Sequence, residues 1–225
     1  MNEQELTNLR HSLAHLLAAA VLEHYPDATL TLGPSIDDGF YYDIKFASPF
    51  SSDTLPTIEA TMKKILPTWT SVSHKEVSKE EALAKGAIAF FGDKYGDSVR
   101  VVQVGGERGA LNGYSMELCG GTHTRSTGEI GLFRIVAESA IAAGVRRIEA
   151  VAGLAAYQLA NSEAARLKAL AGKVGAPVGE LERKVDALLA QNRDLERALH
   201  SAHQREASQR AAQLLSSVET IAGTP

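Results

Sequence analysis

The chain has 225 residues, of which 44% are hydrophobic and 22% are charged, and its formal net charge is −4. This length suits one globular domain with an appendage. The negative net charge argues against a protein that binds nucleic acid over its whole surface, although a local basic groove is compatible with that charge. Cys119 is the single cysteine, so an intramolecular disulfide is excluded. A lone thiol is typical of a reducing compartment. The N-terminus does not look like a secretory signal and no apolar run is long enough to cross a bilayer, so we expect a soluble cytoplasmic protein.

The first part of the chain predicts a mixture of helices and strands. Apolar residues recur at helical spacing from about Glu3 to His24, and Asp38-Gly39 before an aromatic-rich run indicates a β-hairpin within residues 29–46. Further along, the pattern predicts helices at 57–66 and from Ser78, and strands at 71–77, 99–104, 114–118, 131–138 and 144–151. Together these elements indicate an α+β domain over residues 1–153, with a mostly antiparallel sheet and packed helices.

Residues 154–225 predict a helical arm that is interrupted at Gly175-Ala176-Pro177. The second helix carries a heptad seam with an asparagine at one a position, formed by Leu181, Val185, Leu188, Asn192, Leu195 and Leu199. The seam covers only about three heptads. It therefore fits two interpretations: a coiled coil between two copies of the chain, which would form a homodimer, or a helical hairpin within one chain.

Four residues indicate a metal site. His11 and His15 are four residues apart in the first predicted helix, so they lie on one face, one turn apart. Cys119 and His123 flank Gly120-Gly121, which gives the backbone freedom to turn the second histidine back toward the thiol. Imidazole and thiolate are the ligands that zinc prefers. The sequence therefore predicts one Zn²⁺ bound by three histidines and one cysteine.

Other polar residues allow two interpretations each. Arg125, Arg146 and Arg147 either contact the phosphate backbone of a nucleic acid or lie on a solvated strand edge. The run Tyr41-Tyr42-Asp43 either lines a pocket or packs the sheet. The glycine-rich run from Gly105 to Gly109 is predicted to be a turn between strands, because it lacks the Lys-Ser/Thr ending of a P-loop.

With these residues in view, the chain resembles the editing domains of alanyl- and threonyl-tRNA synthetases and the free-standing AlaX-type alanyl-tRNA editing proteins. The alanyl version is closest from about Ala82 to Gly153, through the stretches KGAIAFFGDKYGDSVRVVQVG and SMELCGGTHTRSTGEIGLFRIVAESAIAAGVRRIEAVAG. The front segment, HSLAHLLAAAV with LGPSIDDGFYYDI, is more similar to the threonyl version. The helical tail resembles the segment that follows the editing domain in alanyl-tRNA synthetases. At its front end the chain is similar to the shortest AlaX type, which lacks the preceding barrel-like portion.

The resemblance implies that His11, His15, Cys119 and His123 hold zinc in an editing pocket. It also implies hydrolysis of the ester that joins a wrong amino acid to the 3′ end of a tRNA, with serine or glycine removed from tRNA(Ala). No ATP-binding catalytic domain is present, so we do not expect this chain to activate an amino acid.

Four protein ligands make a closed zinc site, which is normally structural. We therefore expect zinc to order and read the pocket, while backbone N–H groups of Gly120, Gly121 and Thr122 stabilise the developing oxyanion. Two alternatives stay open: a zinc-stabilised tRNA-binding module or synthetase subunit without catalysis, and an enzyme that acts on Ser-tRNA(Thr).

Overall fold

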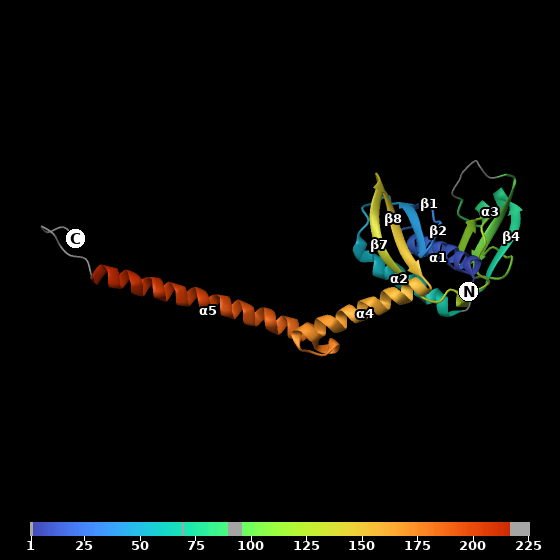
Figure 1. Ribbon diagram of the computed structural model, residues 1–225. Coiled ribbons are helices and arrows are strands. Elements are labelled where there is room, and N and C mark those ends of the chain that lie inside the picture. The colour runs from blue at the N-terminus through green and yellow to red at the C-terminus, as the bar shows by residue number, and fades with distance from the viewer. Residues whose placement is uncertain (1, 69, 90–95, 217–225) are drawn as a thin grey trace. The chain divides into compact units, whose positions relative to one another are not determined.

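The predicted N-terminal helix is present as α1, Glu3–His24, with the expected bounds (Figure 1). Asn2 begins it with a capping box, because its side chain accepts from the amide of Glu5 while the Glu5 carboxylate accepts from the amide of Asn2. Residues 12–21 are all buried. A helix that is buried on every side must pack between other elements, and α1 contacts strands of two different sheets as well as a second helix.

The computed structural model describes residues 2–68, 70–89 and 96–216. Residues 90–95, which belong to the stretch resembling alanyl editing domains, and residues 217–225 of the predicted arm lie outside this part. The chain divides into two compact units, residues 1–160 and 161–225.

One face of α1 packs against a five-stranded antiparallel sheet. Its main path runs β1-β3-β8-β7, and the short β2 pairs with β3. The bounds are β1 Thr29–Leu32, β2 Ser35–Ile36, β3 Gly39–Lys45, β7 Phe133–Ala142 and β8 Val145–Ala152. The predicted hairpin with its aromatic second strand is confirmed in β2 and β3. Helix α2, Leu55–Ile65, packs on α1 and β7 and closes the main hydrophobic core.

A second, three-stranded antiparallel sheet lies on another side of α1, with strand order β4-β5-β6 (Figure 1). Its strands are β4 Val72–Ser78, β5 Ser98–Val104 and β6 Ser115–Leu118, and helix α3, Lys79–Ala84, packs on β4 and β5. The α+β class is confirmed, and the antiparallel strands form two sheets instead of one. Short 3-10 helices occupy Ser52–Thr54, Leu66–Thr68, Thr127–Glu129 and Val178–Glu180.

The predicted break in the helical arm is confirmed between α4, Leu154–Val174, and α5, Leu181–Ser216. Gly175 has a φ of 64°, a left-handed conformation that commonly ends a helix at glycine. No residue of α5 is buried, and the seam residues Leu195 and Leu199 are 60% and 58% exposed. The described part of the chain therefore does not pack the seam into an internal hairpin. None of the described helices is long and apolar enough to cross a membrane.

Candidate metal centre

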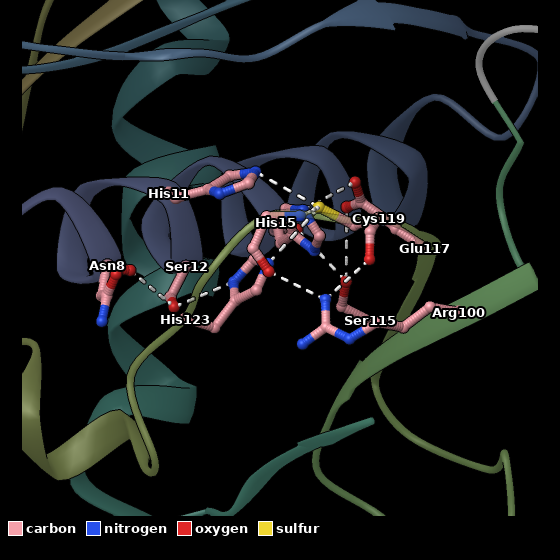
Figure 2. Close-up of polar contacts among 10 residues, drawn as sticks. Asn8, His11, Ser12, His15, Arg100, Ser115, Glu117, Cys119 and His123 are labelled. Carbon is pink, nitrogen blue, oxygen red and sulfur yellow. Dashed lines mark hydrogen bonds and ion pairs between the residues drawn. The ribbon is translucent and has the colours of Figure 1, made fainter. Parts of the chain in front are cut away.

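The four predicted metal ligands, His11, His15, Cys119 and His123, meet in space (Figure 2). The two helix histidines project from one face of α1, and β6 delivers Cys119 at its end. The loop after β6 then brings His123 back to the same point. One potential ligand atom from each residue lies within 4.8 Å of the others.

The spacing of these atoms fits a tetrahedral ion. The sulfur of Cys119 lies 3.5 Å from Nε2 of His11 and 3.5 Å from Nε2 of His123. With Zn–S and Zn–N bonds of about 2.3 and 2.0 Å, sulfur and nitrogen on adjacent corners of a tetrahedron lie roughly 3.5 Å apart. The two edges from Cys119 to the histidines therefore have the dimensions of a zinc site.

His15 has one ring nitrogen free for the fourth corner. Its Nε2 lies 3.3 Å from a carboxylate oxygen of Glu117, whereas its Nδ1 is buried without a hydrogen-bond partner among the described residues. A buried nitrogen with no partner is costly, and a metal ion would satisfy it. Contact between a carboxylate and the second nitrogen is a common arrangement for histidine ligands of metals.

Ser12 orients His123 in a similar way. The Ser12 hydroxyl donates to the carbonyl of Asn8 at 2.8 Å, and its oxygen lies 3.2 Å from Nδ1 of His123. The same Ser12 oxygen accepts from the amide of Thr124 at 3.1 Å, so this serine ties α1 to the loop on both sides of His123. Nε2 of His123 is the ring nitrogen nearer Cys119.

The loop after Cys119 is held by Arg100. One guanidinium nitrogen, Nη1, donates at 2.8 Å to the carbonyls of both Cys119 and Gly121 (Figure 2). The amide of Gly121 in turn donates to the Cys119 sulfur at 3.3 Å. Gly121 also leaves no room for a side chain, because a Cβ there would lie 2.2 Å from Cε1 of His11.

Burial sets the protonation of the cluster. It lowers the pKa of His11, depresses the pKa of His15 well below its usual range together with the neighbouring histidines, and lowers the pKa of His123 to about 3. All three imidazoles are therefore neutral at pH 7, which is the form that binds metals. Burial raises the pKa of the Cys119 thiol and brings that of Glu117 to about 8. A divalent cation would stabilise both anions.

The cluster borders a cavity of about 330 Å³, which we name the ester cavity. His11, His15 and Cys119 form one wall. The remaining lining is mostly apolar, with two polar side chains, and consists of Leu32, Gly33, Pro34, Ser35, Tyr42 and Glu117. Tyr42 both packs in the core and lines the cavity, so both interpretations of this residue hold.

The three arginines proposed to contact nucleic acid each form an ion pair. Arg147 binds Asp43 through two hydrogen bonds of 2.8 and 2.9 Å and covers the ring of Tyr41. The other two pairs are Arg146 with Glu138 and Arg125 with Glu129. Arg125 has a side chain that is 94% exposed. A role of these arginines in tRNA binding stays a prediction.

Sequence reasoning missed Glu117, Ser12 and Arg100. Glu117 lies in β6 and precedes Cys119, the residue directly after that strand, by two positions, so strand alternation places both side chains on one side and was an available signal. Ser12 and Arg100 carried no local signal, because their partners are distant in sequence.

Comparison with known proteins identifies relatives over most of the chain. Residues 99–149 match the family described as the threonyl and alanyl tRNA synthetase second additional domain. The alanine–tRNA ligase of Caulobacter sp. (strain K31) is 42% identical over 200 residues, which cover 87% of this chain and 22% of that protein. The corresponding enzyme of Roseiflexus castenholzii is 38% identical over 230 residues, covering 94% of this chain and 25% of that protein.

A third relative, the alanine–tRNA ligase of Saccharophagus degradans, is 39% identical over 221 residues that cover 98% of this chain. The chain spans about a quarter of the length of these relatives. The chain is thus related to the alanyl-tRNA synthetases, and its residues 99–149 belong to the second additional domain that alanyl- and threonyl-tRNA synthetases share.

Proposed function

We propose that this chain is an editing hydrolase that removes the amino acid from mischarged tRNA in the cytoplasm, with Ser-tRNA(Ala) as its main substrate and Gly-tRNA(Ala) as a second one. The observation that carries the proposal is the metal cluster at the wall of the ester cavity, on a chain related to alanyl-tRNA synthetases. A cavity of about 330 Å³ has room for a small aminoacyl group.

His11, His15, Cys119 and His123 would hold zinc, which supplies a Lewis acid that polarises the ester carbonyl or lowers the pKa of water. Because all four corners are taken by protein, we assign the ion mainly to shaping the pocket and reading the substrate.

The backbone after Cys119 completes the chemistry in this proposal. Ester hydrolysis places negative charge on the former carbonyl oxygen, and N–H groups aimed at that oxygen stabilise it. We assign this role to the amides of Gly120, Gly121 and Thr122. Since the Gly121 amide donates to the Cys119 sulfur, the amides of Gly120 and Thr122 are the primary donors.

Discrimination between serine and alanine follows from the lining of the ester cavity. Leu32, Pro34 and Tyr42 present apolar surface, whereas Ser35 and Glu117 are polar. A site that hydrogen-bonds a substrate hydroxyl rejects the analogue without it more strongly than an apolar pocket rejects an added methyl group. The correctly charged alanine would therefore be spared. Glycine also lacks the hydroxyl, so this contact explains why serine is preferred over both and why glycine is only the second substrate.

Deacylation assays on Ser-tRNA(Ala), Gly-tRNA(Ala), Ala-tRNA(Ala) and Ser-tRNA(Thr) test the function. We expect rapid release of serine from tRNA(Ala), slower release of glycine and retention of alanine. Cys119→Ala should abolish both zinc retention and deacylation, while His24→Ala, which changes a histidine outside the cluster, should retain both. A zinc-loaded protein that is inactive on all four substrates would refute the enzymatic function.

The same assay decides between the main proposal and two alternatives. The closed ligand set favours a zinc-stabilised tRNA-binding module or a synthetase subunit, which would bind tRNA without turnover. Preferential release of serine from tRNA(Thr) would instead favour the threonyl-type substrate, which the front segment of the chain resembles.

A further inference from the structure

The side chain of Arg100 holds two peptide groups of the loop that follows Cys119. Its Nη1 donates at 2.8 Å to the carbonyl of Cys119 and at 2.8 Å to the carbonyl of Gly121 (Figure 2). The backbone of Arg100 adds a third contact, because its carbonyl accepts from the amide of Cys119 at 3.0 Å. Arg100 therefore fixes this loop at the point where it leaves β6.

The two carbonyls bound by Arg100 belong to the same peptide groups as the amides of Gly120 and Thr122. A peptide group is planar, and in its trans form the N–H points opposite to the C=O. None of the described peptide bonds is cis, so both N–H groups are turned away from the guanidinium. Within the described residues neither amide donates a hydrogen bond to the protein. Both are therefore available to an acceptor on the other side of the loop.

The peptide group between these two is held in a different way. Its N–H, which belongs to Gly121, donates to the Cys119 sulfur at 3.3 Å, and its carbonyl, which belongs to Gly120, is not bound by Arg100. Arg100 thus binds alternate peptide groups of the loop. These are the two groups whose amides are the primary oxyanion donors in the proposed function.

We propose that Arg100 is a positioning residue for ester hydrolysis, which presents the amides of Gly120 and Thr122 to the substrate carbonyl oxygen, and this inference rests on the proposed function. When water adds to the carbonyl carbon, an electron pair moves onto that oxygen; the pair returns as the bond to the ribose oxygen breaks and the ribose oxygen takes up a proton. N–H groups that are already aimed stabilise this charge without reorganisation. Arg100 does not line the ester cavity, whereas Cys119 does, so Arg100 acts through the loop and not by touching the substrate.

The charge of Arg100 also strengthens the two amides as donors. Hydrogen bonds from an ionised donor are roughly twice as strong as those between neutral groups. A carbonyl that accepts such a bond is polarised together with the rest of its peptide group, so the N–H at the other end becomes a better donor. Loss of Arg100 therefore affects both the direction and the donor strength of these amides.

Single-turnover deacylation of Ser-tRNA(Ala) by the full chain tests the inference, with zinc in excess and the zinc content of each variant measured. Arg100→Ala removes both hydrogen bonds to the loop carbonyls, and Arg100→Lys keeps a cationic nitrogen donor. Gln4→Ala is the matched control, because its side chain holds the same loop through the Thr122 hydroxyl at 3.0 Å and touches no peptide group.

We expect Arg100→Ala to lower the maximal rate by about 100-fold, as expected for a weakened oxyanion site. The tRNA concentration that gives half of this rate should change by less than about twofold, because the contact matters mainly in the transition state. Arg100→Lys should recover roughly tenfold of the loss, since the ammonium can donate to a carbonyl but lacks the reach of the guanidinium. Gln4→Ala should keep both values within about twofold of the wild type.

The amide resonances of the loop provide a measurement that does not depend on turnover. In the isotope-labelled, zinc-loaded protein, Arg100→Ala should shift the amide resonances of Gly120 and Thr122 more than that of Gly121. The reason is that only the first two amides share a peptide group with a carbonyl that Arg100 binds.

Equal maximal rates for Arg100→Ala and Gln4→Ala would overturn the inference. A loss confined to tRNA affinity would do so as well, and so would equal shifts of the three amide resonances. Failure of the proposed function looks different. A zinc-loaded wild type that releases no serine would refute the enzymatic function, while the pattern of amide shifts would still show whether Arg100 sets the two peptide groups.

Discussion

Replacement of Gly121 by alanine should break the metal site through a single methyl group. A Cβ at this position lies 2.2 Å from Cε1 and 2.6 Å from Nδ1 of His11, whereas real Cβ contacts essentially never fall below 3.0 Å. The ring must therefore move by about 0.8 Å, and metal–ligand distances tolerate only about 0.2 Å. We expect the loss of His11 as a ligand to weaken zinc binding by at least ~100-fold, since even outer partners of metal ligands are worth about 10–100-fold.

Competition with a chromophoric chelator measures the zinc affinity of Gly121→Ala directly. Gly120→Ala is the matched control, because a Cβ at Gly120 meets nothing within 4 Å. It should retain wild-type affinity. Thermal unfolding in excess zinc and in chelator separates the effects, since only the wild type and Gly120→Ala should gain stability from the metal. Equal affinities for the two alanine variants would refute the assignment of His11 as a ligand held against this loop.

Three further outcomes follow from the structure. In the metal-free protein, burial lowers the pKa of His123 to about 3, and because only the unfolded chain takes up the proton, this group makes the unfolding free energy fall as pH drops from 6.5 toward 3. Burial raises the pKa of Glu117 from 4.5 to about 8, and because only the folded chain keeps the proton, this group makes the unfolding free energy fall as pH rises from 4.5 to 8. The two effects oppose each other between pH 4.5 and 6.5, so two limbs of falling stability are expected, one below pH 4.5 and one from pH 6.5 to 8. Glu117→Gln should flatten the second limb in denaturant titrations, and an unchanged limb would contradict this assignment. Arg147→Gln should lower the unfolding free energy by about 1–2 kcal/mol in the same titrations, because it removes two hydrogen bonds from the nearly buried carboxylate of Asp43. An unfolding free energy equal to that of the wild type would exclude a structural role for this pair. If the heptad seam joins two copies, Leu195→Glu should convert a dimer to a monomer by light scattering while Leu189→Glu, which lies off the seam, should not; a monomeric wild type would exclude the dimer.

Local patterns predicted the elements well because their causes are local. The helix Glu3–His24 was predicted with its observed bounds, since its apolar spacing and terminal signals all lie within the segment. The break at Gly175 was predicted for the same reason. The ligand set was also accessible, because both pairs are spaced by four residues and their chemistry points to one kind of ion.

Relations between distant segments could not be predicted. Nothing in the sequence divided the strands into two sheets, because strand alternation does not name a partner. The pairing of Arg147 with Asp43 depends on the register of β8 against β3, which places these residues opposite each other. The hydrogen bond from Arg100 to the carbonyl of Cys119 likewise forms only once β5 and β6 are paired.

The metal cluster joins two parts of the domain that have unequal cores. Among the described residues the main hydrophobic core has twenty-one buried hydrophobic residues, whereas the smaller hydrophobic core beside the three-stranded sheet has seven. The ion would connect α1, in the main core, to Cys119 at the end of β6. Since a bound ion stabilises only the state that holds all its ligands, we expect its loss to loosen β6 and the following loop before it affects β8.

Hydrogen exchange with and without chelator measures this difference. Zinc at 100 times its dissociation constant contributes about 2.7 kcal/mol, which corresponds to roughly 100-fold slower exchange of amides that open only when the site breaks. The amide of Leu118, bonded to the carbonyl of Ile88, should lose this protection in chelator, while the amide of Ile148 in the middle of the large sheet should lose little. A uniform loss across both sheets would show instead that the ion stabilises the domain as one cooperative unit, and that the smaller core is sufficient to hold its sheet.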